Sequence, residues 1–454
     1  MNTSFFGELL QSISERGRAL LERGRRPHAG AHSEDFIGLC EELLSGRGEA
    51  SGVAMAREIL VRYADLKTGP RVAFFEALAH RFGPDGRRLE AAIKVWGQNP
   101  SDASAAEVHL AAEPRRQELL RRLNLAPNGT ALLVKMRAQL LEAMDHRDDL
   151  AVVDADFVHL FSSWFNRGFL VLRRIDWATP ANILEKIIRH EAVHKIKSWD
   201  DLRRRIDPAD RRCYAFFHPA LVDEPLIFVE VALMRDIPGA IAPILMGQRE
   251  ILDPDRANTA VFYSISNCQR GLAGVTFGHF LIKQVVEEIS REMPRLANFV
   301  TLSPAPGFAA WLKREREKEH STVLTHEDHA ALTALDAQGW WQVPERRAAL
   351  QEPLMRAAAH YYLHARNARG LPVDPVARFH LGNGARLEQL DFLGDGSENG
   401  ISQAYGLMVN YRYDLDDIEK NHEAFAEHRT IAVSNAVRKL ARNAPAELVP
   451  LTAG

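Results

Sequence analysis

The sequence predicts an α+β protein, with an all-α helical bundle over residues 1–153 followed by an α/β domain over residues 154–454. Through the first region apolar residues recur at helical spacing, and strand-like alternation is scarce. Short runs rich in β-branched and aromatic residues begin after about residue 155. The chain of 454 residues is about three times the usual domain length, so we expect two domains.

Three amphipathic helices support the helical region. The first runs from Phe6 to Leu21, and the others cover residues 133–144 and 157–164. Short turns with Gly, Pro or charged residues separate the helical stretches, and no fixed-period repeat is visible, so a bundle is favoured over a solenoid. Because this region carries no chemical motif of its own, we expect it to serve in oligomerisation.

The second region alternates strands and helices. Residues 169–172, 213–217 and 226–233 are expected to be strands, the last two as antiparallel partners. A strand, helix, strand and helix follow over residues 260–313, and residues 326–366 are helical. Residues 378–393 are expected to form two strands around Gly382-Asn383-Gly384, and residues 418–442 one closing helix.

Composition excludes several classes of protein. The chain is 46% hydrophobic and 26% charged with a net charge of -3, so nothing in its overall field favours nucleic acid or an anionic membrane. Neither a secretory leader nor an apolar run long enough to cross a bilayer is expected. Cys40, Cys213 and Cys268 form no CxxC pattern, which argues against a disulfide framework and a structural zinc site and fits the reducing cytoplasm.

A glycine-rich turn follows the strand at Ala260. Residues 269–278 contain Gly271, Gly274 and Gly278 and open an amphipathic helix. Free N–H groups and the positive end of the helix dipole make such a turn an anion site, and the expected anion is a pyrophosphate. The alternative is that the glycines only permit close packing of the helix on the sheet.

Ser303 is a candidate reactive side chain. The two strands of this βαβ unit should be parallel, so the glycine turn and Ser303 both lie at their carboxyl ends and face one cleft. The alternative for Ser303, which precedes a proline, is a turn or N-cap residue. The alternating Ala377-Arg378-Phe379-His380-Leu381 by itself favours a hydrogen-bonded strand residue at His380.

Several motifs then resemble one family, malonyl-CoA decarboxylase. The motifs cover nearly all of residues 155–415 in order and comprise Glu191-Ala192-Val193-His194, Glu224-Pro225-Leu226, residues 274–282, residues 302–308, residues 375–385 and Gly406-Leu407-Met408-Val409-Asn410-Tyr411-Arg412-Tyr413. The resemblance implies a helical N-terminal domain and a catalytic domain of the GNAT-like fold. In that fold parallel strands splay apart, the pantetheine lies in the split, and the CoA pyrophosphate lies on the loop that opens the central helix.

The resemblance also assigns residues and a reaction. It implies that Ser303 and His380 are catalytic and that Tyr413 belongs to the substrate pocket. The loop that binds CoA is Ala273, Gly274, Val275, Thr276, Phe277, Gly278 and His279. Some relatives carry Glu where this chain has Thr276, so no acid role is transferred. The implied reaction converts malonyl-CoA to acetyl-CoA and CO2 in a homo-oligomer, a dimer or tetramer. Neither metal nor organic cofactor is expected, because the thioester carbonyl accepts the electrons.

Rival functions remain from other classes. His190-Glu191-Ala192-Val193-His194 matches the HExxH zinc-peptidase pattern, but the charged Lys195 follows it and no third ligand is evident, so zinc hydrolysis is disfavoured. A GNAT-type CoA-dependent acyltransferase would use the same phosphate loop to move an acetyl group to an amine. A non-catalytic acyl-CoA sensor would bind the ligand without turnover.

Overall fold

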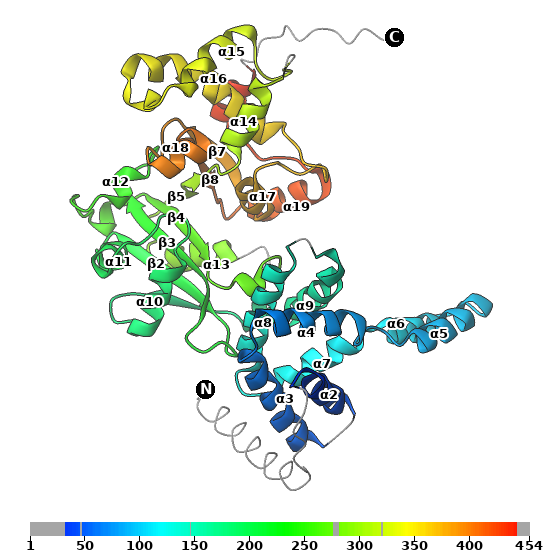
Figure 1. Cartoon of the computed structure of the whole chain (residues 1–454). Coiled ribbons are helices and arrows are strands. Elements are labelled where there is room, and N and C mark those ends of the chain that lie inside the picture. The colour runs from blue at the N-terminus through cyan, green and yellow to red at the C-terminus, as the bar shows by residue number, and fades with distance from the viewer. Residues whose placement is uncertain (1–31, 46–47, 146, 276–280, 319–320, 443–454) are drawn as a thin grey trace, which may run out of the picture. The chain divides into compact units, whose positions relative to one another are not determined.

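The structure is a computed structural model that describes residues 32–45, 48–145, 147–275, 281–318 and 321–442 (Figure 1). It divides into two compact units. The helical unit comprises Met1–Val171, Phe217–Leu226 and Gln269–Phe277. The sheet unit comprises Leu172–Phe216, Ile227–Cys268 and Gly278–Gly454.

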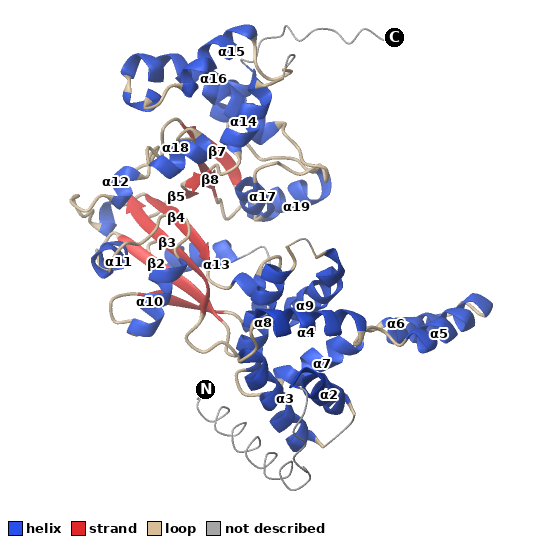
Figure 2. Cartoon of the chain, viewed as in Figure 1, coloured by secondary structure: helices blue, strands red, loops and turns tan. Residues whose placement is uncertain are grey.

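The helical unit is built almost wholly from helices (Figure 2). Aromatic side chains form its core: the Phe36 and Phe74 rings lie 5.1 Å apart and those of Phe157 and Phe161 5.4 Å apart. The helices predicted over residues 133–144 and 157–164 are confirmed as α8 and α9, and the one predicted from Phe6 lies outside the described residues. The helix bounds are α2 His32–Leu44, α3 Glu49–Ala64, α4 Thr68–His80, α5 Gly86–Gln98, α6 Asp102–Ala112, α7 Arg115–Asn124, α8 Gly129–Ala143 and α9 Ala151–Trp164.

Helices α5 and α6 pack on each other as a hairpin that projects from the rest of the helical unit (Figure 1). Local capping fixes both starts. The Asp85 side chain accepts hydrogen bonds from the first backbone amides of α5, and Ser101 forms a capping box with Ser104 at the start of α6. No described residue of α5 is buried. The hairpin therefore has little packing of its own against the unit's core.

The sheet unit is centred on one eight-stranded sheet with the order β1-β2-β3-β4-β5-β8-β6, in which β7 also pairs with β8. All residues of β2 and nearly all of β3 are buried, so both faces of the sheet are covered. Arg211 donates to the Ile244 carbonyl of α12 (Ala242–Leu245), whereas its neighbour Arg212 donates to Glu292 of α13 (Leu281–Glu292), so these helices cover opposite faces. The strands are β1 Val171–Ile175, β2 Arg211–Phe217, β3 Pro225–Met234, β4 Thr259–Asn267, β5 Asn298–Thr301, β6 Ser303–Pro304, β7 Arg386–Asp391 and β8 Met408–Arg412.

The remaining helices connect these strands. They are α10 Ala181–His190, α11 Trp199–Ile206, α12 Ala242–Leu245, α13 Leu281–Glu292, α14 Phe308–Arg316, α15 His326–Leu332, α16 Pro344–Leu363, α17 Pro375–Gly382, α18 Glu398–Ala404, α19 Ile418–His428 and α20 Asn435–Arg442. Each helix in the described ranges is too short or too polar to cross a bilayer.

The predicted βαβ unit is confirmed as β4, α13 and β5. Strands β4 and β5 run parallel from Thr259, opposite Asn298, to Phe262, opposite Thr301. Beyond Phe262 the register with β5 ends, while β4 continues antiparallel to β3 as far as Asn267. The last part of β4 therefore has a neighbouring strand on one side only. This opening between β4 and β5 is the arrangement expected of a GNAT-like sheet, and the α+β class is confirmed.

Of the two strands predicted over residues 378–393, the first is wrong and the second is confirmed. Residues 375–382 form helix α17, because Pro375 occupies the first turn and the Asp374 side chain caps the helix by accepting from the Ala377 amide at 2.8 Å. Only the second strand exists, as β7. His380 is therefore a helical residue and not a strand residue.

Two further predictions need correction. The strand expected at residues 169–172 starts later, at Val171, because residues 167–169 form a short 3-10 helix. The closing helix is in fact two, because Arg429 adopts a left-handed conformation with a φ of 56° at the end of α19. The chain then runs parallel beside β7, where the Leu387 amide donates to the Ala432 carbonyl at 2.9 Å, before α20 begins.

Candidate active site

A cavity of about 290 Å³ lies in the sheet unit where β4 and β5 part. None of the described residues that line it is charged. Most of them are apolar, and the main polar groups come from Ser303, His380 and Asn267. The lining residues are Val193, Ile227, Phe262, Tyr263, Ile265, Asn267, Leu302, Ser303, Pro304, Pro375, Val376, Phe379 and His380.

Ser303 is held at this cavity by the strands around it. It begins β6, pairs with Val409 of β8 and is only 6% exposed. Its hydroxyl donates to the Thr301 Oγ1 at 2.9 Å. Thr301 is fully buried, and its Oγ1 also accepts from the Tyr411 amide at 3.2 Å. The Ser303 side chain is therefore oriented by a threonine that is itself fixed to the neighbouring strand.

His380 reaches the same point from the last turn of α17. Its Nε2 lies 3.1 Å from the Ser303 Oγ, and its Nδ1 lies 2.8 Å from the Tyr413 hydroxyl. The ring stacks on Tyr411 with centroids 4.6 Å apart. Burial lowers the pKa of His380 to about 3, so the imidazole is neutral at pH 7.

The hydrogen bonds of Ser303 assign the tautomer of His380. The Ser303 hydroxyl donates its one proton to the Thr301 Oγ1, so the Ser303 Oγ accepts from the Nε2–H of His380. Nδ1 of the neutral imidazole is then an acceptor, and it accepts from the Tyr413 hydroxyl, whose pKa burial raises well above its ordinary value. The acidic N–H of the ring thus faces the cavity, where Ser303 also lies.

The hydroxyl and the imidazole predicted from the sequence therefore meet, although their catalytic roles stay a prediction. Tyr413 is also at this centre, with its hydroxyl on the far side of the His380 ring from Ser303. Two residues were not singled out from the sequence, Thr301 and Tyr411. Thr301 could have been found by its position two residues before Ser303, which places both side chains on one face of an extended chain.

The described start of the predicted phosphate loop, residues 273–275, lies in the helical unit. Gly274 has a φ of 75°, a conformation that favours glycine. A Cβ on Gly271 would lie 1.9 Å from the Val134 carbonyl oxygen, so Gly271 permits close packing of the turn on helix α8, and not of a helix on the sheet. The buried Arg137 donates to the carbonyl oxygens of Gly271 and Ala273 at 2.8 and 2.7 Å and fixes the loop. Thr276, Phe277, Gly278 and His279 lie outside the described residues.

The HExxH sequence does not form the helical zinc-peptidase geometry. Helix α10 ends at His190, and Glu191 is extended, with φ -65° and ψ 109°. The two histidines are therefore not one turn apart on a helix, as two ligands of one zinc ion would be. The Glu191 carboxylate accepts from the hydroxyls of Ser264 and Ser266 instead.

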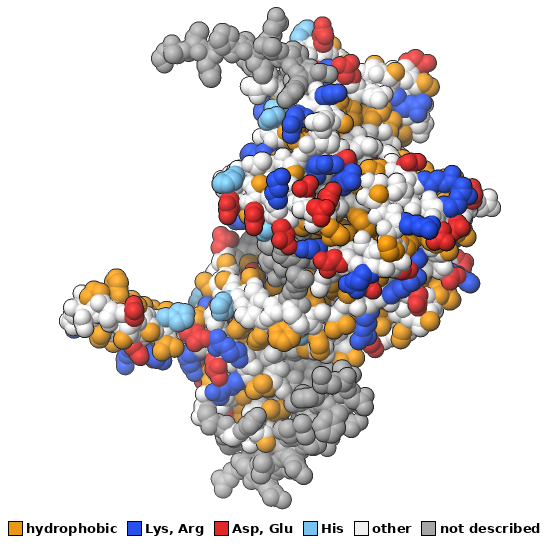
Figure 3. All heavy atoms as spheres, turned by 180° about the vertical axis from the view of Figure 1, so that it is seen from behind, with side chains coloured by type: hydrophobic (Ala, Val, Ile, Leu, Met, Phe, Trp, Pro, Cys, Tyr) orange, Lys and Arg blue, Asp and Glu red, His pale blue; other side chains and the backbone are white. Residues whose placement is uncertain are grey.

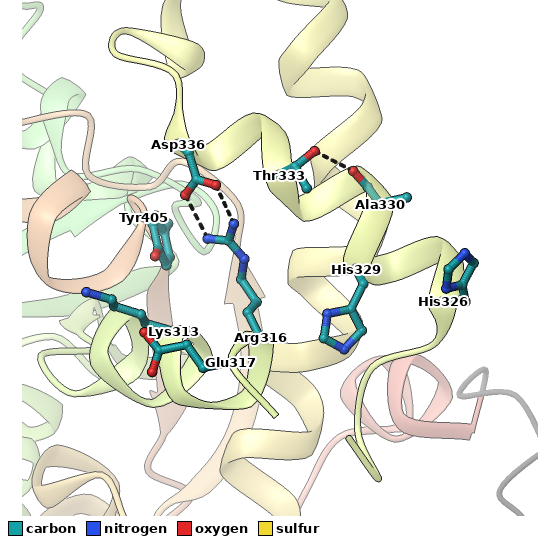
Figure 4. A pocket seen from close by; sticks show the side chains of 9 residues that line it. All are labelled: Lys313, Arg316, Glu317, His326, His329, Ala330, Thr333, Asp336 and Tyr405. Carbon is teal, nitrogen blue, oxygen red and sulfur yellow. Dashed lines mark hydrogen bonds and ion pairs between the residues drawn. The ribbon is translucent and has the colours of Figure 1, made fainter. Parts of the chain in front are cut away.

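A second, larger cavity of about 670 Å³ lies between α14, α15 and Tyr405 (Figure 4). Two of its lining residues form an ion pair with each other: the Arg316 guanidinium pairs with both carboxylate oxygens of Asp336 at 3.0 and 2.6 Å. Its lining residues are Lys313, Arg316, Glu317, His326, His329, Ala330, Thr333, Asp336 and Tyr405. It contains none of the predicted site residues, and the smaller cavity is the candidate active site.

Comparison with known proteins gives matches along most of the chain. Residues 168–449 match the model of the malonyl-CoA decarboxylase C-terminal domain, and residues 82–165 match that of the N-terminal domain. Mitochondrial malonyl-CoA decarboxylase from Anser anser anser is 36% identical over 413 residues, which cover 84% of this chain and 82% of the relative. The protein of that name from Rattus norvegicus is 35% identical over 439 residues, 89% of this chain and 85% of the relative.

Solved structures agree with these matches. The crystal structure of malonyl-CoA decarboxylase from Rhodopseudomonas palustris has 58% identity and a TM-score of 0.87, covering 90% of this chain and 100% of that chain. The one from Agrobacterium vitis has 56% identity and a TM-score of 0.86, covering 90% and 99%. From the family models and the relatives together, the chain belongs to the malonyl-CoA decarboxylase family.

Proposed function

We propose that this protein is a carboxy-lyase that converts malonyl-CoA to acetyl-CoA and CO2 without a metal or organic cofactor. The observation that carries the proposal is the contact between Ser303 and the neutral His380 at an uncharged cavity. Family membership supplies the substrate, and the geometry supplies two groups suited to its acyl end.

The substrate provides its own electron sink. When the bond to the carboxylate breaks, the electron pair delocalises into the thioester carbonyl as an enolate, and CO2 leaves. The protein must orient the thioester, stabilise the developing oxyanion and supply a proton to the carbon. A hydroxyl and an imidazole N–H that face the same cavity can perform these tasks.

We assign the proton to His380 and the orientation of the acyl group to Ser303. The Nε2–H of His380 points to the cavity, and a thioester enolate is a stronger base than imidazolate, so a neutral imidazole can protonate it. Solvent then restores the proton on Nε2. The Ser303 hydroxyl hydrogen-bonds the carboxylate or the thioester oxygen. Apolar walls leave the substrate carboxylate poorly solvated, which favours its conversion to neutral CO2.

The loop from Ala273 to His279 is proposed to hold the CoA diphosphate. Support comes from the left-handed Gly274 and from Arg137, whose guanidinium holds the carbonyl oxygens of Gly271 and Ala273 at the start of this loop. Tyr413 is proposed to act through His380, because its hydroxyl bonds to that ring.

The test is incubation of the purified protein with malonyl-CoA and no acceptor. We expect stoichiometric acetyl-CoA and CO2. If acetyl transfer to an added amine were seen instead, with no CO2 from malonyl-CoA, the GNAT-type acyltransferase would be the better assignment. Binding of malonyl-CoA without any turnover would indicate the acyl-CoA sensor.

The helical region 1–153 is proposed to mediate assembly into a homo-oligomer, with residues 154–454 as the catalytic domain. The two family models meet between residues 165 and 168, which supports a boundary nearby. The α5–α6 hairpin exposes four large apolar side chains to 47–54%, namely Ile93, Val95, Trp96 and Leu110. Figure 3 shows hydrophobic side chains gathered on this projecting hairpin, as expected of a surface covered by a second copy.

A cytoplasmic location is proposed on the evidence of the cysteines. Cys40, Cys213 and Cys268 are all buried, and these described cysteines form no disulfide bond. Cysteines outside disulfides are usual where glutathione keeps thiols reduced.

A further inference from the structure

The turn after α10, residues 191–195, is held by one buried carboxylate. Glu191 is 6% exposed. Its Oε1 accepts from the amides of Val193 and His194 at 2.8 and 2.7 Å. Its Oε2 accepts from the hydroxyls of Ser264 and Ser266 at 2.7 and 3.2 Å. This carboxylate therefore joins the turn to the end of strand β4.

Arg205 of α11 holds the other end of the same turn. Its guanidinium donates to the His194 carbonyl at 2.7 Å and to the Lys195 carbonyl at 3.4 Å. The fully buried Glu230 of β3 pairs with it at 3.2 Å. Glu191 thus binds two backbone amides of the turn, and Arg205 binds two of its backbone carbonyl groups.

Both segments that Glu191 joins line the candidate active site. Side chains alternate along β4, so Ser264 and Ser266 face Glu191 whereas Ile265 and Asn267 line the cavity. Val193 lines the cavity from the turn. The region of β4 concerned is the part beyond Phe262, which β5 does not support. Glu191 thus provides hydrogen bonds to the part of β4 that has no pairing with β5.

We propose that Glu191 is a positioning residue, which sets the distance between the Val193 wall and the Ile265 wall of the acyl cavity and so places the thioester against Ser303 and His380. The inference rests on the proposed decarboxylase function. It also gives a role to the HExxH sequence, in which the acidic residue organises a turn and not a metal site. A loosened wall would misplace the acyl group, whereas CoA affinity would remain because the diphosphate is bound elsewhere.

The test compares Glu191→Ala and Glu191→Gln with the wild type. Glu191→Ala removes all four hydrogen bonds, and we expect kcat for malonyl-CoA to fall by about 10- to 100-fold while KM changes by less than about threefold. Glu191→Gln keeps an oxygen for the two amides but loses the acceptor for the hydroxyls, so its kcat should lie between those of Glu191→Ala and the wild type. If Glu191→Ala does not fold, Glu191→Gln and the double variant Ser264→Ala/Ser266→Ala carry the test.

The matched control is Asp328→Asn. Asp328 is also a buried carboxylate of the sheet unit, 2% exposed, and accepts from the Thr325 amide at 3.0 Å, but it does not line the cavity. We expect it to reduce the unfolding temperature with kcat unchanged. If the Glu191 variants keep wild-type kcat, or lose activity only as the fraction of folded protein falls, Glu191 is a structural residue only. A wild type that releases no CO2 would refute the proposed function instead, so the two failures are distinguishable.

Discussion

At the scale of single residues, the site depends on how Tyr413 and Thr301 constrain His380 and Ser303. The four side chains form one chain of hydrogen bonds in which each hydroxyl or ring nitrogen has a defined partner. Sequence spacing could not reveal it, because His380 and Tyr413 are 33 residues apart and Ser303 and His380 are 77 apart. The family motifs named three of the four residues, and only the structure connects them.

The neutral state of His380 predicts the pH dependence of catalysis. Because burial lowers its pKa to about 3, the imidazole does not take up a proton between pH 8 and pH 6. We expect kcat/KM for malonyl-CoA to stay within about twofold over that range, where an ordinary histidine with a pKa near 6.5 would titrate. A loss of activity with an apparent pKa of 6 to 7, with no change in the stability of the fold over the same pH range, would contradict a neutral His380.

Replacement of Tyr413 by Phe tests the tautomer. Without the phenol donor, Nδ1 can carry the proton, and the N–H that faces the cavity is lost in part of the population. We expect Tyr413→Phe to lower kcat by about 10- to 100-fold with KM little changed. Tyr63→Phe is the control, since it removes a similar hydroxyl whose bond to Gln139 lies in the helical unit. Equal kinetics for Tyr413→Phe and the wild type would remove the tyrosine from the mechanism.

At the scale of elements, the sequence predicted the βαβ unit well and α17 poorly. Strand β4 and helix α13 carry clear apolar periods, and their pairing follows from the parallel crossover rule. In α17 the Asn383-Gly384 pair suggested a hairpin, but Gly384, with a φ of 80°, ends a helix there. The Asp374 cap and Pro375 in the first turn favour a helix at residues 375–382, whereas the Asn383-Gly384 pair favours a hairpin turn, and here the helix forms.

Asp374 gives a stability prediction at this scale. Burial raises its pKa to about 6, above the unfolded value near 3.8, so the folded state holds the proton more firmly. The contribution of Asp374 to stability is therefore present at acid pH and is lost as pH rises through about 6. Asp374→Asn retains a capping oxygen but does not titrate. We therefore expect the free energy of unfolding of the variant, minus that of the wild type, to be larger at pH 7.5 than at pH 4.5. Urea unfolding at both pH values measures it, and an unchanged difference would contradict the raised pKa.

At the scale of the whole molecule, Ser303 and His380 belong to the sheet unit, whereas the helical unit contains the start of the proposed CoA loop and an exposed apolar hairpin. The all-helical class of this unit was predictable from the apolar periodicity alone, but the projecting hairpin was not. Amphipathic helices whose apolar face is buried in the core have the same sequence pattern as those whose apolar face is exposed. The α5–α6 hairpin differs only in what it packs against. Its apolar residues remain exposed in a single chain.

The hairpin predicts the effect of a charge on assembly. We expect Ile93→Asp, in a side chain 51% exposed, to reduce the oligomer to a smaller species in light scattering after gel filtration. Val61→Asp, 55% exposed on α3, is the control and should leave the mass unchanged. The same mass for Ile93→Asp and the wild type would place the interface elsewhere.

The most direct test of the account is turnover of malonyl-CoA by His380→Asn, measured as acetyl-CoA and CO2 beside the dissociation constant for CoA. Asparagine can hydrogen-bond near Ser303 but cannot transfer a proton to an enolate. We predict that turnover falls by about 100-fold or more while CoA binds with nearly wild-type affinity. Wild-type turnover in His380→Asn would contradict the claim that this imidazole protonates the product.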